Sequence, residues 1–235
     1  NLTPAGVEPH DLELTSDDID RIDDADLVFY IGSGFQPSIA AAAKRRRKVA
    51  TDVGAGLMSR KGDPHFWLDP TLMAKAVDRI ARAAAKADPK NAKFMRDNAR
   101  RYKLQLAGLD SEFSNSLSHC QRNEIVTAHA AFGYLAARYR LRQEAVTGIS
   151  PDVEPSPKRL AQLSALIRRD GVTTVFFEKL VPRDFADTLA RDAGVRTALL
   201  DPLEALTKKE YDAFDDYLTV MRRNLTALKD ALGCS

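Results

Sequence analysis

Residues that build specialised sites are scarce in this chain of 235 residues, which has two cysteines, one tryptophan and four histidines. Neither cysteine belongs to a C-x-x-C pair, which argues against a zinc site made of thiolates. No apolar run approaches the roughly 18 residues needed to cross a bilayer. The 35 basic residues nearly balance the 33 acidic ones, and a net charge of +2 gives no long-range field that favours nucleic acid. We therefore expect no nucleic-acid partner.

Apolar runs and helix signals alternate along the chain. The continuous run at residues 27–31 ends at Gly32, which is the pattern of a strand buried on both faces of a parallel sheet. Further strands are expected at 125–127, 144–147, 172–177 and 196–200, and helices at 16–25, 69–88, 130–140, 156–170, 182–193 and 207–232. The sequence therefore predicts an α/β fold with mostly parallel sheets flanked by helices.

One long helix is expected to join two lobes. After Pro89 the chain has apolar side chains at mixed three- and four-residue spacing and no further proline up to residue 118. We predict an N-terminal α/β lobe over residues 1–88, a connecting helix over 89–118 and a C-terminal α/β lobe over 119–235.

The two cysteines, Cys120 and Cys234, stand at the start of the predicted C-terminal lobe and near the end of the chain. We expect a disulfide that ties these two points together, which requires an oxidising compartment. Two free, buried thiols are the alternative that the sequence leaves open.

Three of the four histidines stand in loops or directly after strands. His10 and His65 each follow a proline, which fixes an extended backbone and restricts the imidazole. His129 and Asp201 come after predicted strands, at the carboxyl ends where open parallel sheets bind ligands. Three imidazoles and one carboxylate, two from each lobe, form a tetrahedral set that suits Zn(II). A surface or capping role is the alternative for any one of these histidines taken alone.

Two other polar residues bear on this site. Glu178 follows the strand predicted at 172–177, at the same sheet edge, and its carboxylate could orient an imidazole by accepting its N–H. A helix cap or a surface position is the alternative. The fourth histidine, His119, follows no strand, and we expect it to have no role as a ligand.

Four stretches of the sequence, in order, resemble the signature stretches of one protein family. They are VEPHD at 7–11, DPHFWLDP at 63–70, TAHAAFGY at 127–134 and LDPL at 200–203. The family is the zinc- and manganese-binding group of ABC-transporter solute-binding proteins, and the resemblance covers nearly the whole chain. It implies two α/β lobes joined by one long helix, with a metal ion held between the lobes by His10, His65, His129 and Asp201.

The resemblance also implies a metal and a role. Histidine at position 129 resembles the zinc members, whereas glutamate there is typical of manganese members. We therefore expect high-affinity binding of Zn(II), in preference to Mn(II) or Fe(II), and delivery to an ABC-transporter permease. The family places such a protein in the periplasm or otherwise outside the cytoplasm, free or lipid-anchored, and we expect a monomer.

The sequence departs from the family pattern in two places. Residues 53–62 are short and lack the histidine-rich loop that zinc members often carry before the second signature. The strand and helix that the family places before the first signature are also missing, so we expect the N-terminal lobe to lack them.

Two other functions stay open at this point. A zinc hydrolase would use three histidines and leave one coordination position for a reactive water. Asp201 as a fourth ligand and the lack of an H-E-x-x-H motif argue against an enzyme. A metal-binding surface adhesin is the second alternative, which the sequence does not exclude.

Overall fold

The computed structural model describes residues 1–10, 12–151 and 153–235. Asp11, the last residue of the first signature stretch, therefore lies outside the described residues. The chain divides into two compact units, residues 1–110 and 111–235. Within the described ranges, no helix combines the length and the apolar character that crossing a membrane requires.

The first unit contains a small parallel sheet. Strand β1 (Val28–Tyr30) pairs with β2 (Ala50–Asp52), with Val28 opposite Ala50. Helices α1 (Ser16–Asp24) and α2 (Pro37–Arg45) pack together, and α2 packs on β1. The expectation that β1 is buried on both faces is wrong, because Phe29 is 39% exposed. Among the described residues this sheet has only two strands. Its surface is too small for helices to cover on both sides, so one face of β1 stays partly exposed.

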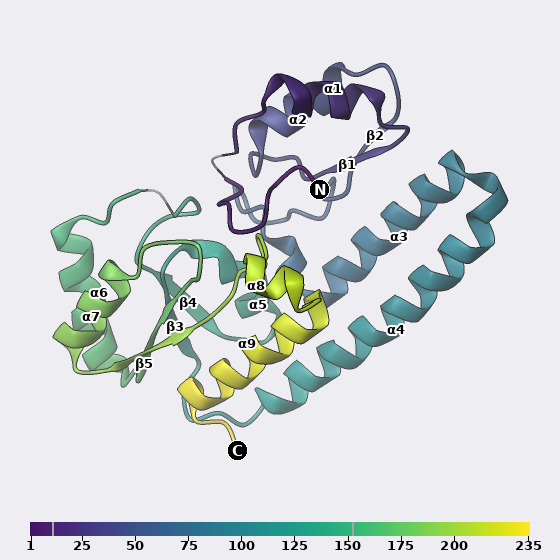
Figure 1. Ribbon diagram of the computed structural model, residues 1–235. Coiled ribbons are helices and arrows are strands. Elements are labelled where there is room, and N and C mark those ends of the chain that lie inside the picture. The colour runs from purple at the N-terminus through teal and green to yellow at the C-terminus, as the bar shows by residue number, and fades with distance from the viewer. Residues whose placement is uncertain (11, 152) are drawn as a thin grey trace. The chain divides into compact units, whose positions relative to one another are not determined.

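Two long helices follow. The side chain of Asp69 accepts hydrogen bonds from the backbone N–H groups of Thr71 and Leu72, so it caps α3 (Pro70–Ala87) at its start. A 3₁₀ turn at Pro89–Asn91 precedes α4 (Ala92–Ser116), the long helix that the sequence predicts, and the unit boundary falls within α4. The two helices run side by side as a hairpin (Figure 1).

The second unit is built on a four-stranded parallel sheet in the order β4-β3-β5-β6. Its strands are β3 (Glu124–Thr127), β4 (Arg142–Ala145), β5 (Thr174–Phe177) and β6 (Arg196–Leu199). Its helices are α5 (Gly133–Arg138), α6 (Pro157–Asp170), α7 (Asp184–Ala193), α8 (Lys208–Asp212) and α9 (Tyr217–Leu232), and a 3₁₀ turn at Ala130–Phe132 precedes α5. Helices α6 and α7 cover one face of this sheet, and α5 and α9 the other (Figure 1).

The predicted fold class, α/β with parallel sheets flanked by helices and one long helix, is confirmed. One predicted helix is wrong: residues 207–232 form two helices, α8 and α9. Phe214, between them, has a left-handed backbone (φ 56°), and Asp216 caps α9 by accepting from the Thr219 N–H. A left-handed residue cannot continue an α-helix, so the chain turns there.

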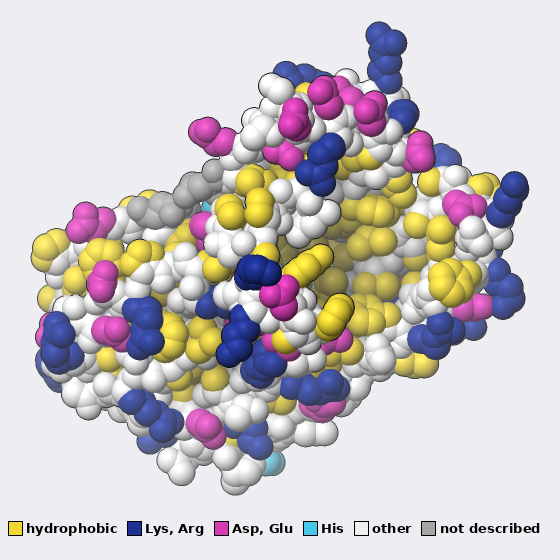
Figure 2. All heavy atoms as spheres, in the orientation of Figure 1, with side chains coloured by type: hydrophobic (Ala, Val, Ile, Leu, Met, Phe, Trp, Pro, Cys, Tyr) yellow, Lys and Arg dark blue, Asp and Glu magenta, His cyan; other side chains and the backbone are white. Residues whose placement is uncertain are grey.

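Charged side chains of both signs are interspersed on the face of the molecule drawn in Figure 2. This agrees with the near balance of basic and acidic residues in the composition. Surface charge of this kind keeps a protein soluble without a strong field of one sign.

Candidate metal centre

His10 and His65 form a pair within the first unit. Their ring centroids lie 5.6 Å apart, and each offers a ring nitrogen within 4.8 Å of the other's. The His65 side chain is fully buried. Two imidazoles at this separation can bind the same cation, because each Zn–N bond is about 2.0 to 2.1 Å long.

The His65 imidazole is oriented by the residue two positions before it. An Asp63 carboxylate oxygen accepts from the His65 backbone N–H at 3.0 Å and lies 2.8 Å from His65 Nδ1. A carboxylate on Nδ1 favours the tautomer with its proton there, which places the lone pair on Nε2 for a metal. Trp67 and Phe35 pack edge-on against the two imidazoles, Trp67 on His65 and Phe35 on His10, with centroids 5.2 Å and 4.9 Å apart. These rings give the pair an apolar wall.

His129 is held in the same manner in the second unit. It follows β3, at the carboxyl end of the sheet, and is fully buried. One Glu178 oxygen accepts from the His129 backbone N–H at 3.1 Å, and the other lies 2.6 Å from His129 Nδ1. Glu178 is therefore placed to orient the imidazole and to direct Nε2 away from itself.

A second carboxylate lies at the other ring nitrogen of His129. Glu204 Oε1 is 3.3 Å from His129 Nε2, and the Glu204 side chain is 2% exposed. Burial lowers the pKa of His129, but the hydrogen bond with Glu178 and the negative charges of the Glu178 and Glu204 carboxylates outweigh it and raise the pKa to about 10. Without metal, the ring is therefore an imidazolium between two carboxylates at neutral pH. An imidazole nitrogen beside a buried carboxylate is a place where a cation can replace a proton.

Asp201, which the sequence predicts as the fourth ligand, has other partners in the structure. One of its oxygens lies 2.5 Å from Lys179 Nζ, and the other accepts from the Leu203 N–H at 2.8 Å. Burial raises the pKa of Asp201, and the ion pair with Lys179 opposes this. The carboxylate beside His129 is instead Glu204, three residues later, and a ligand role for Asp201 stays a prediction.

Sequence reasoning missed Glu204. The signal was present, because Glu204 is the next acidic residue after Asp201 in the same loop, which also contains Pro202. Which of the two carboxylates lies beside His129 depends on the conformation of this loop, in which Leu203 has a left-handed backbone (φ 55°). The fourth histidine, His119, is exposed, and its carbonyl accepts from the N–H of the terminal Ser235.

The two cysteines form a disulfide in the second unit. Cys120 and Cys234 lie in a short antiparallel bridge, and backbone hydrogen bonds join the same segments at Gln121 to Gly233 and at Arg122 to Leu232. The expected cross-link between residue 120 and the chain end is present in the structure. Because α9 ends at Leu232, the disulfide fixes the carboxyl end of this helix.

Comparison with known proteins identifies the class to which this fold belongs. The family model described as zinc-uptake complex component A, periplasmic (ZnuA), matches residues 1–231. The zinc-binding protein AdcA of Streptococcus pyogenes serotype M18 is 37% identical over 97% of this chain and 50% of its own length. The high-affinity zinc uptake system protein ZnuA of Bacillus subtilis is 36% identical over 98% of this chain and 79% of its own.

A solved structure supports the same conclusion. The Zn(II)-bound ZnuA-like domain of Streptococcus pneumoniae AdcA aligns with a TM-score of 0.84 and 34% identity, over 98% of this chain and 89% of that one. The chain spans about half the length of the AdcA proteins that it matches. The chain belongs to the ZnuA family of zinc-uptake binding proteins.

Proposed function

We propose that this protein binds one Zn(II) ion with high affinity outside the cytoplasm and delivers it to the permease of an ABC transporter for import. The ligands are His10, His65 and His129 with one carboxylate, and the geometry favours Glu204 over Asp201 for that position. The protein acts in this role as a monomer.

One observation carries the proposal: a buried imidazole with a carboxylate at each of its nitrogens. Glu178 lies 2.6 Å from His129 Nδ1 and Glu204 lies 3.3 Å from His129 Nε2. The Nδ1 partner has the geometry of a group that orients a ligand, and the Nε2 partner that of a ligand. Asp63 stands to His65 as Glu178 stands to His129. This repeated arrangement supports a metal site better than a structural salt bridge.

The donor set supports zinc. Imidazole nitrogens suit zinc, whereas manganese prefers carboxylate, carbonyl and water ligands, and a set of three imidazoles and one carboxylate fills a tetrahedron. Relatives with 36% and 37% identity are named zinc-binding and zinc-uptake proteins. The names of these relatives support Zn(II), rather than Mn(II) or Fe(II), as the ion that this chain binds.

The proposed location and partner follow from the family. Its description as periplasmic supports a place outside the cytoplasm, and the zinc-binding AdcA of Streptococcus pneumoniae is named a lipoprotein. The disulfide between Cys120 and Cys234 supports an oxidising compartment. Import needs a membrane permease, which we propose as the partner of the zinc-loaded form.

A zinc hydrolase is disfavoured by the same donor set. Four protein ligands leave no open position for the water that hydrolysis requires. A role as surface adhesin stays a prediction from the sequence, and no feature of the described residues favours it.

The test is metal analysis of the purified protein, followed by titration of the stripped protein with zinc against a chelator of known affinity. We expect one zinc per chain. His129→Ala should weaken zinc binding by more than about 100-fold, because loss of a ligand exceeds the 10- to 100-fold typical of an outer-shell partner. His119→Ala is the matched control and should bind as the wild type does. Absence of zinc binding by the folded wild-type protein would remove the proposal.

The carboxylate ligand is assigned by a second pair of variants. Glu204→Gln should weaken zinc binding strongly, whereas Asp201→Asn should cost clearly less. The reverse order would return the fourth position to Asp201 and leave the rest of the proposal intact.

A further inference from the structure

A polar cavity of about 500 Å³ lies at the end of the second unit opposite His129. Its walls come from the end of α4 and from the segments that precede β3 and β4, at residues 114–123 and 138–141. His129 follows the other end of β3, and a strand of four residues is roughly 13 Å long. The cavity is therefore separate from the proposed metal ligands of this unit.

The charged side chains that line the cavity, among the described residues, are all arginines: Arg122, Arg138 and Arg140. The carboxylates of Glu124 and Asp170 pair instead with Arg142, which is not one of the lining residues. Hydroxyl and amide groups on the walls come from Ser114, Ser118 and Asn123. We call this cavity the arginine pocket. Guanidinium groups match the oxygens of phosphate and carboxylate, so an anion is the ligand that suits it.

Arg122 is fixed by the backbone around it. Its Nε donates to the Gly171 carbonyl at 2.8 Å, and its backbone N–H donates to the Leu232 carbonyl at 3.1 Å. The disulfide between Cys120 and Cys234 joins the same two segments, and Cys120 itself lines the pocket. Because Nε is engaged, Nη1 and Nη2 are the groups left to donate to a ligand. A side chain that is already held loses less freedom when it binds.

Arg140 has a backbone conformation that glycine usually adopts. The Leu141 N–H donates to the Ala136 carbonyl at 2.8 Å at the end of α5, and Arg140 has a φ of 59°. Helices α6, α7 and α9 end with the same kind of hydrogen bond, to the residue five positions earlier, and their left-handed residues are Gly171, Gly194 and Gly233. Arginine is strained in this conformation, and such strain is typical of positions where the side chain has a function.

Stabilisation of α5 explains only part of the cluster. Basic side chains favour the carbonyl end of a helix, and Arg138 lies in the last turn of α5. Arg122 lies in another segment, before β3, so the end of α5 does not account for it. Like charges that share one cavity also repel each other, and a bound anion removes this repulsion.

The rest of the walls suits an apolar group. Leu117, Tyr139 and Leu141 line the pocket and are 7%, 7% and 8% exposed. The volume lies within the range of roughly 300 to 1,000 Å³ that is typical of small-molecule sites. We propose that the arginine pocket binds a phosphomonoester, with its phosphate on the three arginines and its organic part against these apolar side chains. A monoester phosphate carries nearly two negative charges at neutral pH, which suits three guanidinium groups better than a carboxylate does.

The test is calorimetric titration of the folded, metal-free protein with phenyl phosphate, inorganic phosphate and phenol. Removal of the metal prevents phosphate from binding to zinc. We expect one phenyl phosphate per chain, bound about tenfold more tightly than inorganic phosphate because its ring is buried. Phenol, which lacks the charge, should not bind.

Two variants test the arginines. Arg122→Gln and Arg140→Gly should each weaken binding of phenyl phosphate by about tenfold or more, because each removes a charged donor. Arg140→Gly should at the same time keep or raise the melting temperature, because glycine relieves the left-handed backbone. A purely structural arginine would not separate affinity from stability in this way. If Arg122→Gln does not fold by circular dichroism, Arg140→Gly alone decides the test.

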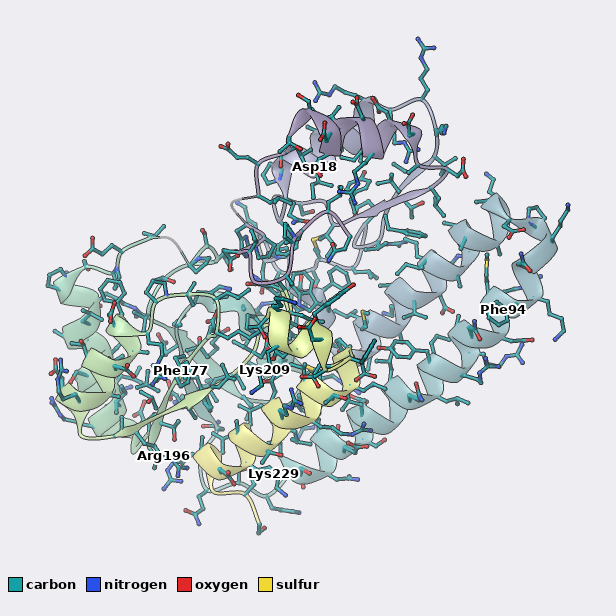
Figure 3. All side chains as sticks on the ribbon, in the orientation of Figure 1. Asp18, Phe94, Phe177, Arg196, Lys209 and Lys229 are labelled. Carbon is teal, nitrogen blue, oxygen red and sulfur yellow. A yellow bond between two sulfur atoms is a disulfide. The ribbon has the colours of Figure 1, made fainter. Side chains whose placement is uncertain are left out.

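Arg196→Gln is the matched control. Arg196 is an exposed arginine at the start of β6, at the same edge of the sheet, and is labelled in Figure 3. It is not one of the residues that line the pocket. This variant loses the same charge and should bind phenyl phosphate as the wild type does.

Sedimentation with vesicles separates two sources of the phosphate. Binding to phosphatidic acid vesicles but not to phosphatidylcholine vesicles, lost in Arg140→Gly, would identify the ligand as a lipid headgroup. Binding of phenyl phosphate without binding to either vesicle would identify it as a soluble phosphate ester. Both results support the pocket.

The contrary outcomes are distinct from those of the zinc proposal. No saturable binding of phenyl phosphate at millimolar concentration, or an equal loss of binding in Arg196→Gln, would overturn this inference and leave the zinc role standing. The arginine variants should bind zinc as the wild type does, since the pocket contains no proposed metal ligand. Failure of the wild type to bind zinc would overturn the proposed function alone.

Discussion

We predict that zinc binding releases a proton from His129, because the imidazole of His129 is protonated in the metal-free protein. Without metal, Glu178 and Glu204 flank the ring, and the pKa of His129 is raised to about 10. A metal on Nε2 must displace the proton that this nitrogen carries. At any pH below about 10, zinc and this proton therefore compete for the same atom.

The magnitude follows from that pKa. Between pH 7.5 and 8.5 an ordinary histidine, with a pKa near 6.5, is already deprotonated. His129 is not, so each pH unit should raise the apparent zinc affinity by roughly tenfold. Over the same range, calorimetry should detect close to one proton released per zinc bound.

The assay is a zinc titration against a competing chelator at several pH values, with calorimetry in two buffers of different ionisation enthalpy. Glu178→Gln is the informative variant, because it removes one charge beside the ring and keeps its shape. We expect a lower His129 pKa, and hence a flatter dependence of affinity on pH. A wild-type protein with no proton release and a flat profile above pH 7.5 would refute the reasoning.

The raised pKa of His129 also makes the stability of the metal-free protein depend on pH. The folded pKa of His129 lies above its unfolded value of about 6.5. The stabilisation is therefore complete below pH 6.5 and is lost as the pH rises through about 10. The melting temperature of the stripped protein should fall across this window, and that of the zinc-loaded protein should fall less.

Two further predictions concern the second unit. Replacing Cys120 and Cys234 with serine removes a cross-link between residues 114 positions apart. The free energy of unfolding, measured in urea, should fall by about 2 to 5 kcal/mol. A free-thiol assay of the denatured, unreduced wild type should detect almost no thiol, and two reactive thiols would contradict the disulfide. Asn224→Ala removes both hydrogen bonds to the Asp201 backbone and should cost roughly 2 kcal/mol or more and weaken zinc binding. The exposed Thr226→Ala on the same helix is the control, and equal effects of the two would contradict the role of Asn224.

Much of the fold was predictable because its signals are local. The proline and aspartate at the start of α3 act within one turn, and β3 and β5 of the second unit are short, largely buried runs. The break between α8 and α9 was not predictable, because Phe214 has no intrinsic preference for a left-handed backbone. The half-exposed β1 was missed because burial depends on how many strands a sheet contains, which a single strand does not encode.

The carboxylate beside His129 Nε2 shows where sequence reasoning about a site ends. Asp201 and Glu204 are both acidic, both follow β6 and lie three residues apart, so neither spacing nor residue type separates them. What separates them is a partner in another loop: Lys179 pairs with Asp201, whereas Glu204 lies at His129 Nε2. A lysine after β5 reads as a solvated surface residue in the sequence, since lysine is almost never buried without a partner. Lys179 meets Asp201 only once β5 and β6 lie side by side, so which of the two carboxylates lies beside His129 depends on the tertiary structure.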